Sequence, residues 1–141
     1  MSSDRRFPEK AMRRLNRQVA QLYRQGRYAQ AVELAVQARD SALQYLGEGH
    51  PDYAASLHNL AILYQAMGNY AAAEPLYQQA REIGRVALGE DHPNYATNLN
   101  NLAGLFIATG RATRAFPLME QAVHIIDLLT GQVFSFGSES Q

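Results

Sequence analysis

Residues 47–59 read GEGHPDYAASLHN and residues 89–101 read GEDHPNYATNLNN, so the same pattern returns after 42 residues. Glycines repeat at the same interval, at Gly26, Gly68 and Gly110 and again at Gly47, Gly89 and Gly131. A fixed period of this length is typical of solenoid proteins, in which each unit buries its apolar face by stacking on its neighbours. The sequence therefore predicts a stack of similar units, with function on the surface of the stack.

One period contains two helical patterns joined by a turn. Apolar side chains share one helical face at Leu57, Leu60, Ala61 and Tyr64. Gly68-Asn69 then ends the pattern, and a second one follows at Ala73, Leu76, Tyr77, Ala80 and Ile83. Each unit is therefore expected to be a helical hairpin. Three such units fit the chain, at residues 12–46, 54–88 and 96–130.

Prolines and small residues refine this expectation. His50-Pro51 and His92-Pro93 are expected to open helices, because proline suits the first turn of a helix. The two histidines are interpreted as fixing the turn rather than binding metal. Pro75 and Pro117 are expected close enough to the first turn of the second helices to be tolerated there. The repeated alanines mark places where helices must approach closely: Ala61, Ala73, Ala80, Ala103, Ala115 and Ala122.

The pattern resembles the tetratricopeptide repeat, whose consensus is W-x2-L-G-x2-Y followed by A-x3-F-x2-A. The second unit matches at Leu57, Leu60, Ala61, Tyr64, Ala73, Tyr77 and Ala80, and the third at Leu99, Leu102, Ala103, Phe106, Ala115, Met119 and Ala122. The first unit matches more weakly, at Leu15, Leu22, Ala31, Ala35 and Ala38. The 42-residue period, with HPxYAxxLxNLAxLY and AEPLYxxA in the second unit, resembles the kinesin-light-chain form of this repeat.

The resemblance implies a fold and a division of the chain. The fold would be all-α, a right-handed superhelical solenoid of three helical hairpins over residues 11–130. A basic flexible N-terminus would occupy residues 1–10, and a C-terminal tail would occupy residues 131–141.

Composition narrows the class of protein. The chain has no cysteine, which excludes disulfides and thiolate metal sites, and it has no apolar run long enough to span a membrane. The first ten residues lack the apolar segment of a signal peptide. The sequence therefore predicts a single cytoplasmic domain.

Signatures of catalysis are equally scarce. Four histidines are scattered along the chain, and the sequence contains no HExxH, no phosphate-binding loop and no GxSxG. We therefore expect a non-enzymatic protein without a cofactor or a bound metal.

The charges are unevenly distributed, although lysines and arginines equal aspartates and glutamates in number. Residues 1–27 contain eight basic side chains but only Asp4 and Glu9 as acids, so this segment is strongly basic and the remainder is acidic. Such asymmetry indicates either a surface for an acidic partner or a solvated basic helix.

The resemblance also implies where a partner would bind. In this family the first helices line a concave groove that holds an extended peptide. The positions carried over onto this chain are Arg13, Asn16, Arg17, Tyr23, Arg24, His58, Asn59, Ile62, Gln65, Asn100, Asn101 and Ile107. Asparagine both donates and accepts, so Asn59 and Asn101, one repeat apart, would grip a peptide main chain or else brace the neighbouring helix. Selectivity would come from pockets at Tyr23, Ile62 and Ile107 and from the arginines.

The last helical pattern, residues 112–130, is apolar on more than one side. A surface helix normally carries a single apolar stripe, so the second face predicts an interaction surface. We expect self-association through Phe116, Met119, Val123, Ile126 and Leu129. Either the tail folds back and seats Val133, Phe134 and Phe136 on the helix, or two chains pair. A two-fold homodimer is favoured over a head-to-tail pair and over the folded tail.

These observations predict a protein–protein interaction module that binds an extended peptide segment, with an acidic partner as one option. Two alternatives remain open. One is a nucleic-acid or anionic-surface binder that acts through the basic N-terminal helix, which the lack of interleaved aromatic residues disfavours. The other is a structural self-assembly unit.

Overall fold

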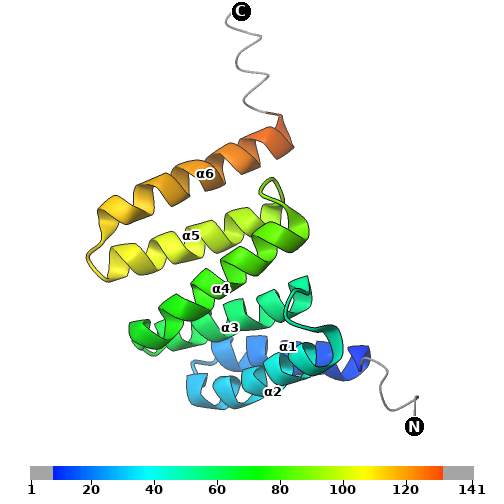
Figure 1. Ribbon diagram of the computed structural model, residues 1–141. Helices are drawn as coiled ribbons and strands as arrows, with labels where there is room; N and C mark the ends of the chain where they lie inside the picture. The colour runs from blue at the N-terminus through cyan, green and yellow to red at the C-terminus, as the bar shows by residue number, and fades with distance from the viewer. Residues whose placement is uncertain (1–7, 132–141) are drawn as a thin grey trace, which may run out of the picture.

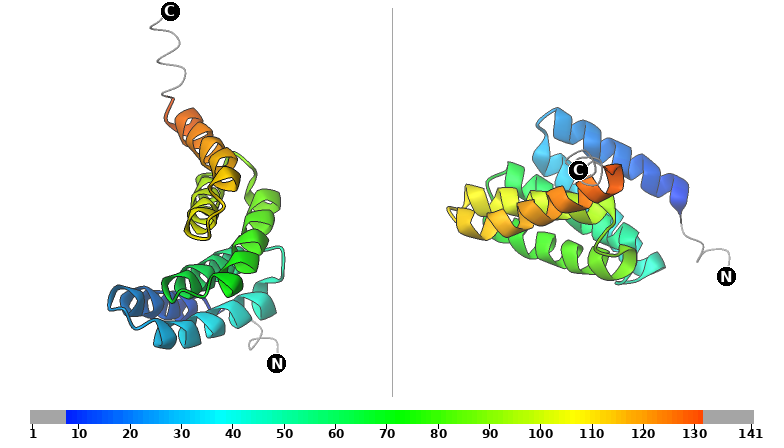
Figure 2. Two further views of the ribbon diagram at one scale, coloured as in Figure 1. Left: turned by 90° about the vertical axis from the view of Figure 1, so that its left-hand side faces the viewer. Right: turned by 90° about the horizontal axis from the view of Figure 1, so that it is seen from above.

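The computed structural model describes residues 8–131, and these residues form six helices (Figure 1). The helices are α1 (Glu9–Arg24), α2 (Tyr28–Leu46), α3 (Pro51–Ala66), α4 (Tyr70–Leu88), α5 (Pro93–Ala108) and α6 (Ala112–Thr130). They pair into three antiparallel hairpins that stack along a curved path (Figure 2). The predicted all-α repeat fold is therefore confirmed.

The hairpins begin earlier than the periodicity suggests. They start at Glu9, Pro51 and Pro93, each three residues before the expected unit. Glu9 and Lys10 therefore belong to α1 rather than to a flexible N-terminus. The predictions for residues 1–7 and for the tail from residue 132, including Val133, Phe134 and Phe136, lie outside the described residues.

The His-Pro pairs act as helix caps, as predicted. His50 Nδ1 accepts a hydrogen bond from the backbone N–H of Asp52 at 3.0 Å, and His92 Nδ1 accepts one from Asn94 at 3.1 Å. Pro51 and Pro93 are the first residues of α3 and α5, where the missing N–H leaves no intrahelical bond unmade. Each pair thus begins the next hairpin.

The turns within and between hairpins need glycine. Gly68, between α3 and α4, has φ +80°, and Gly89, between α4 and α5, has φ +95°. Side chains rarely adopt this region, so glycine repeats at both kinds of turn. Asn69 then begins α4, because its side-chain oxygen accepts from the N–H of Ala72 at 3.2 Å.

The core is continuous through the stack and depends on alanine where helices meet. Buried alanines lie on facing sides of the paired helices, at Ala31, Ala35, Ala38, Ala42, Ala61, Ala73, Ala80, Ala103, Ala115 and Ala122. Leucines fill the space beside them; Leu60 and Leu102, for example, are at most 1% exposed. A larger side chain at an alanine position would push two helices apart and cost about 1–3 kcal/mol.

Pro75 and Pro117 lie deeper in their helices than expected. Each stands five residues after the first residue of α4 or α6, in the second turn, where it removes a backbone hydrogen bond. The carbonyls left without that bond belong to Ala71 and Thr113, which are both exposed. Water can therefore satisfy them, and the helices continue through both prolines.

The histidine caps can be tested at His92. Replacing His92 with Ala should lower the free energy of unfolding by about 1 kcal/mol, because the N–H of Asn94 loses its acceptor. His92→Ser is the control, since serine caps helices well and should stay within a few tenths of a kcal/mol of the wild type. Urea denaturation measures both. Equal stability of the alanine and serine variants would contradict the cap.

Candidate functional site

Three adjoining hollows lie along the first helices of the hairpins. The first, of about 300 Å³, lies between α1 and α3 and is lined by charged and amide side chains, including Arg13, Asn16 and Asp52. The second, of about 180 Å³, lies between α3 and α5. The third, of about 290 Å³, lies further along α1 and α3. Asn59 lines all three hollows, so it stands at their junction.

The third hollow has the most apolar character. Val19, Tyr23, Ile62 and Leu63 line it, and Arg24 stands beside them. The Tyr23 ring packs at a tilt on Tyr28 with 5.6 Å between ring centroids, which holds one wall in place.

The second hollow is built differently, because α4, the second helix of its hairpin, helps to form it. Gly84 and Leu88 of α4 line it together with Asn94, Thr97 and Asn98 of α5. A side chain on Gly84 would meet Asn98 Nδ2 at 3.3 Å, so glycine lets α4 and α5 approach closely here. The sequence reasoning missed Gly84 and Asn98. A glycine in the interior of a helix was the available signal, because it costs stability unless packing requires it.

His58 and Asn101 contact each other across the second and third hairpins. Asn101 Nδ2 lies 2.7 Å from His58 Nε2, which joins α5 to α3. An amide nitrogen only donates, so in this orientation of the Asn101 amide Nε2 is the acceptor. Nδ1 is buried and has no hydrogen-bond partner among residues 8–131. The ring also packs edge-on to Tyr77, with 5.5 Å between ring centroids.

Burial governs the protonation of this pair of rings. It lowers the pKa of His58 to about 4, because a charged imidazolium would lose its solvation. It also raises the pKa of Tyr77 to about 12, with a smaller contribution from the charge of Tyr23. Both groups are therefore neutral near pH 7.

The other predicted groove residues differ in their surroundings. The side chain of Gln65 already makes a hydrogen bond within the protein, since its Oε1 accepts from the Tyr77 hydroxyl at 2.8 Å. Arg17, Asn100 and Ile107 are exposed and line none of the three hollows. The structure thus gathers seven of the predicted residues around the hollows: Arg13, Asn16, Tyr23, Arg24, His58, Asn59 and Ile62.

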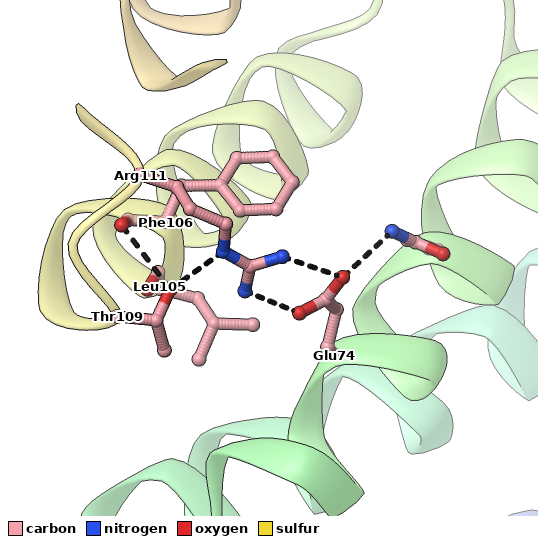
Figure 3. Close-up of polar contacts among 6 residues, drawn as sticks. Glu74, Leu105, Phe106, Thr109 and Arg111 are labelled. Atoms are coloured by element: carbon pink, nitrogen blue, oxygen red, sulfur yellow. Dashed lines mark hydrogen bonds and ion pairs between the residues drawn. The ribbon is translucent and has the colours of Figure 1, made fainter. Parts of the chain in front are cut away.

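An ion pair fixes the second hairpin to the third (Figure 3). Arg111, at the start of α6, makes two hydrogen bonds to the Glu74 carboxylate of α4, one of them at 3.2 Å. Arg111 Nε also donates to Thr109 Oγ1 at 3.0 Å, and its guanidinium lies 4.8 Å from the centre of the Phe106 ring. The hydrogen bond from Arg111 lowers the pKa of Glu74. The equivalent residues of the preceding junction, Val32 and Asn69, cannot form such a pair.

Residues 8–131 offer neither a cluster of metal ligands nor a helix that could span a membrane. Nowhere in this range do three His, Asp or Glu side chains gather as a metal ion would require. In the same range, every helix is too short or too polar to cross a membrane.

The pKa of His58 leads to a prediction about pH. The unfolded chain binds a proton at His58 below about pH 6.5, whereas the folded protein resists protonation down to about pH 4. Stability is therefore lost as the pH falls through this window, by about 2 kcal/mol between pH 7 and pH 5. Urea titrations of wild type and His58→Gln at both pH values measure it. The other three histidines are common to both proteins, so equal pH dependence of the two would contradict the assignment.

The comparisons with known proteins agree with this geometry. The model of the tetratricopeptide repeat family matches residues 12–85 and 59–126. A putative kinesin light chain of Podosopora anserina with nearly identical TPR-like repeats is 31% identical over 82% of this chain and 55% of its own, with a TM-score of 0.75. The crystal structure of BtubC (BKLC) from P. vanneervenii is 26% identical over 76% of this chain and 42% of its own, with a TM-score of 0.70.

These solved structures are longer than the chain, which spans about half their length. No curated protein matches the chain. The match to the family model nonetheless extends from residue 12 to residue 126, through all three hairpins. The chain belongs to the tetratricopeptide repeat family and has kinesin-light-chain-like repeats.

Proposed function

We propose that this chain is a non-enzymatic interaction module that binds an extended peptide of a partner protein along α1, α3 and α5. The position of Asn59 at the junction of the three hollows carries the proposal. Proteins of this family generally mediate contacts between proteins, and hollows along the first helices would suit successive side chains of one peptide. A cytoplasmic location, predicted from the sequence, would fit this role.

Asn59 has the chemistry that a peptide main chain needs. It is half-buried, and within residues 8–131 its amide makes no hydrogen bond to another residue. A carboxamide can donate to a peptide carbonyl and accept from a peptide N–H, so one residue can hold the main chain whatever its sequence. Asn101 differs because His58 engages its amide, and its role would be to position α5 and His58.

The charges around the hollows indicate the kind of peptide. Arg13 lines the first hollow and Arg24 the third, although Glu9 and Asp52 also line the first. The third hollow, next to Arg24, is apolar. We infer a peptide with an apolar side chain seated near Tyr23 and Ile62 and an acidic residue beside it.

The asparagines allow a sharp test with peptides selected from a random display library on the wild-type chain. Asn59→Ala should weaken binding of these peptides about three- to tenfold through the loss of one hydrogen bond, with an unchanged melting temperature. Asn100→Ala, at an exposed position outside the hollows, is the matched control and should bind normally. Fluorescence anisotropy gives the affinities. An Asn59→Ala variant that binds as well as wild type would refute the proposed groove contact.

The arginines separate an acidic peptide from a nucleic acid. Arg24→Glu should weaken the selected peptides, whereas Arg14→Glu, on the same helix but outside the hollows, should not. A nucleic-acid site on the basic helix would respond to both variants and would show a steep fall of affinity with salt. Mobility-shift assays with random RNA and DNA at low salt should therefore show no binding. A clear shift that both variants abolish would favour the nucleic-acid alternative.

A further inference from the structure

The outer face of α6 corresponds to the face of α4 that packs against the next hairpin. In α6 no described residue covers this face. In α4, Tyr77 is 2% exposed and Gly84 is buried, on the side that α5 covers. The residues 42 positions later in α6 are Met119 and Ile126, which are 38% and 43% exposed. Phe116 and Val123 lie on the same face and are each 58% exposed. Figure 1 shows α6 as the outermost helix at one end of the stack.

Leu129 lies at the C-terminal end of the same helix and is 53% exposed. A hollow of about 370 Å³ runs along the face and is lined by Phe116, Met119, Glu120, Val123, His124 and Asp127. Exposed aromatic and branched residues at consecutive turns of one helix form a patch of the kind that binds another protein surface.

The opposite end of the stack, among residues 8–131, has a polar face. In α3, Leu60 and Leu63 pack against Val19, Ala31 and Ala35 of the preceding hairpin. The residues 42 positions earlier in α1 are Gln18 and Gln21, and both are exposed. Tyr53, which packs against Ala38 and Ala42, likewise corresponds to the exposed Ala11. α1 therefore presents a polar face of the kind that caps a solenoid.

The two ends are thus poor partners for each other. A head-to-tail contact would press the polar side chains of Gln18 and Gln21 onto the apolar stripe of α6, where only Glu120, His124 and Asp127 among the residues that line the hollow could pair with them. Head-to-tail contacts build open chains unless they form a ring, so the last copy of such a chain would still have an uncovered α6 face.

The face of α6 is instead suited to a second copy of itself. Its apolar residues lie on both sides of Val123, with Phe116 and Met119 before it and Ile126 and Leu129 after it. Glu120 and His124 are exposed next to this stripe, one helical turn apart. If two α6 helices run antiparallel about an axis near Val123, Glu120 of one copy comes within two residues of the position opposite His124 of the other, and the contact occurs twice.

We propose that two copies of this chain dock through α6 in antiparallel orientation about a two-fold axis near Val123. The dimer is closed, because each polar α1 face points away from the interface. A single helix face per copy gives an interface at the small end of the known range, so we expect a dissociation constant of about micromolar. This inference is independent of the peptide groove, which lies along α1, α3 and α5.

The mass of the 141-residue chain tests the proposal first. Sedimentation equilibrium at tens of micromolar should give a dimer, and Ile126→Glu should weaken dimerisation about a hundredfold because each dimer would bury two carboxylates. Val86→Glu is the matched control, since Val86 is 71% exposed on α4, away from the stripe, and this variant should still dimerise. A monomeric wild-type chain would overturn the proposal, because the tail or another protein would then be the occupant. Equal dimerisation of Ile126→Glu and wild type would overturn the use of α6.

Cysteine cross-linking tests the geometry, and the absence of natural cysteines makes the result clear. Val123→Cys should form a disulfide-linked dimer under mild oxidation, because a two-fold axis brings the two residues within the short Cα distance that a disulfide needs. Val86→Cys should not. A mixture of Gln18→Cys and Val123→Cys would give a mixed disulfide only in a head-to-tail contact. That product, or equal cross-linking of Val86→Cys, would overturn the two-fold arrangement.

Discussion

The close approach of helices at alanine and glycine positions is the constraint on which the rest of this structure depends. Each helix has an apolar stripe that it can bury only against neighbouring helices, and small residues let those neighbours come near enough to exclude water. Ala61, Ala80 and Ala103 are at most 1% exposed for this reason.

Departures from the repeat give the surface its local chemistry. Gly84 replaces the alanine that stands at position 42, and α4 then lies close enough to α5 to help form the second hollow. Glu74 and Arg111 join the second and third hairpins by charge, where the first junction has Val32 and Asn69. One junction is thus held by an ion pair as well as by packing, while the other is held by packing. The hollows therefore adjoin unlike junctions despite the regular period.

Much of the fold could be predicted from the sequence, because the signals are local and repeated. The glycines, the His-Pro pairs and the alanine spacing each indicate one backbone event and occur at least twice. The two prolines inside α4 and α6 were misplaced, since the tolerance of a helix for proline depends on whether water reaches the freed carbonyl. That exposure is a property of the packed stack and cannot be read from the residue type.

The candidate site was less predictable, because it depends on contacts between repeats. Asn59 and Asn101 occupy the same position of the consensus, yet His58 engages only Asn101. The difference arises one unit earlier, where the residue that corresponds to His58 is Asn16. The repeat pattern gives both asparagines the same expected role. Whether the side-chain amide makes a hydrogen bond within the protein depends on the residue that faces it from the preceding hairpin.

The His-Pro caps have a consequence for how chains of this kind can change in length. A cap uses only a histidine, a proline and the backbone two residues further on, so it works without help from the hairpin before it. The segment between two caps therefore carries its own start signal, while its apolar face still packs on the neighbouring hairpins. Copying that segment would add one hairpin to the stack and leave the polar face of α1 unchanged. The His-Pro junction is therefore a suitable boundary for duplication of a repeat within the gene.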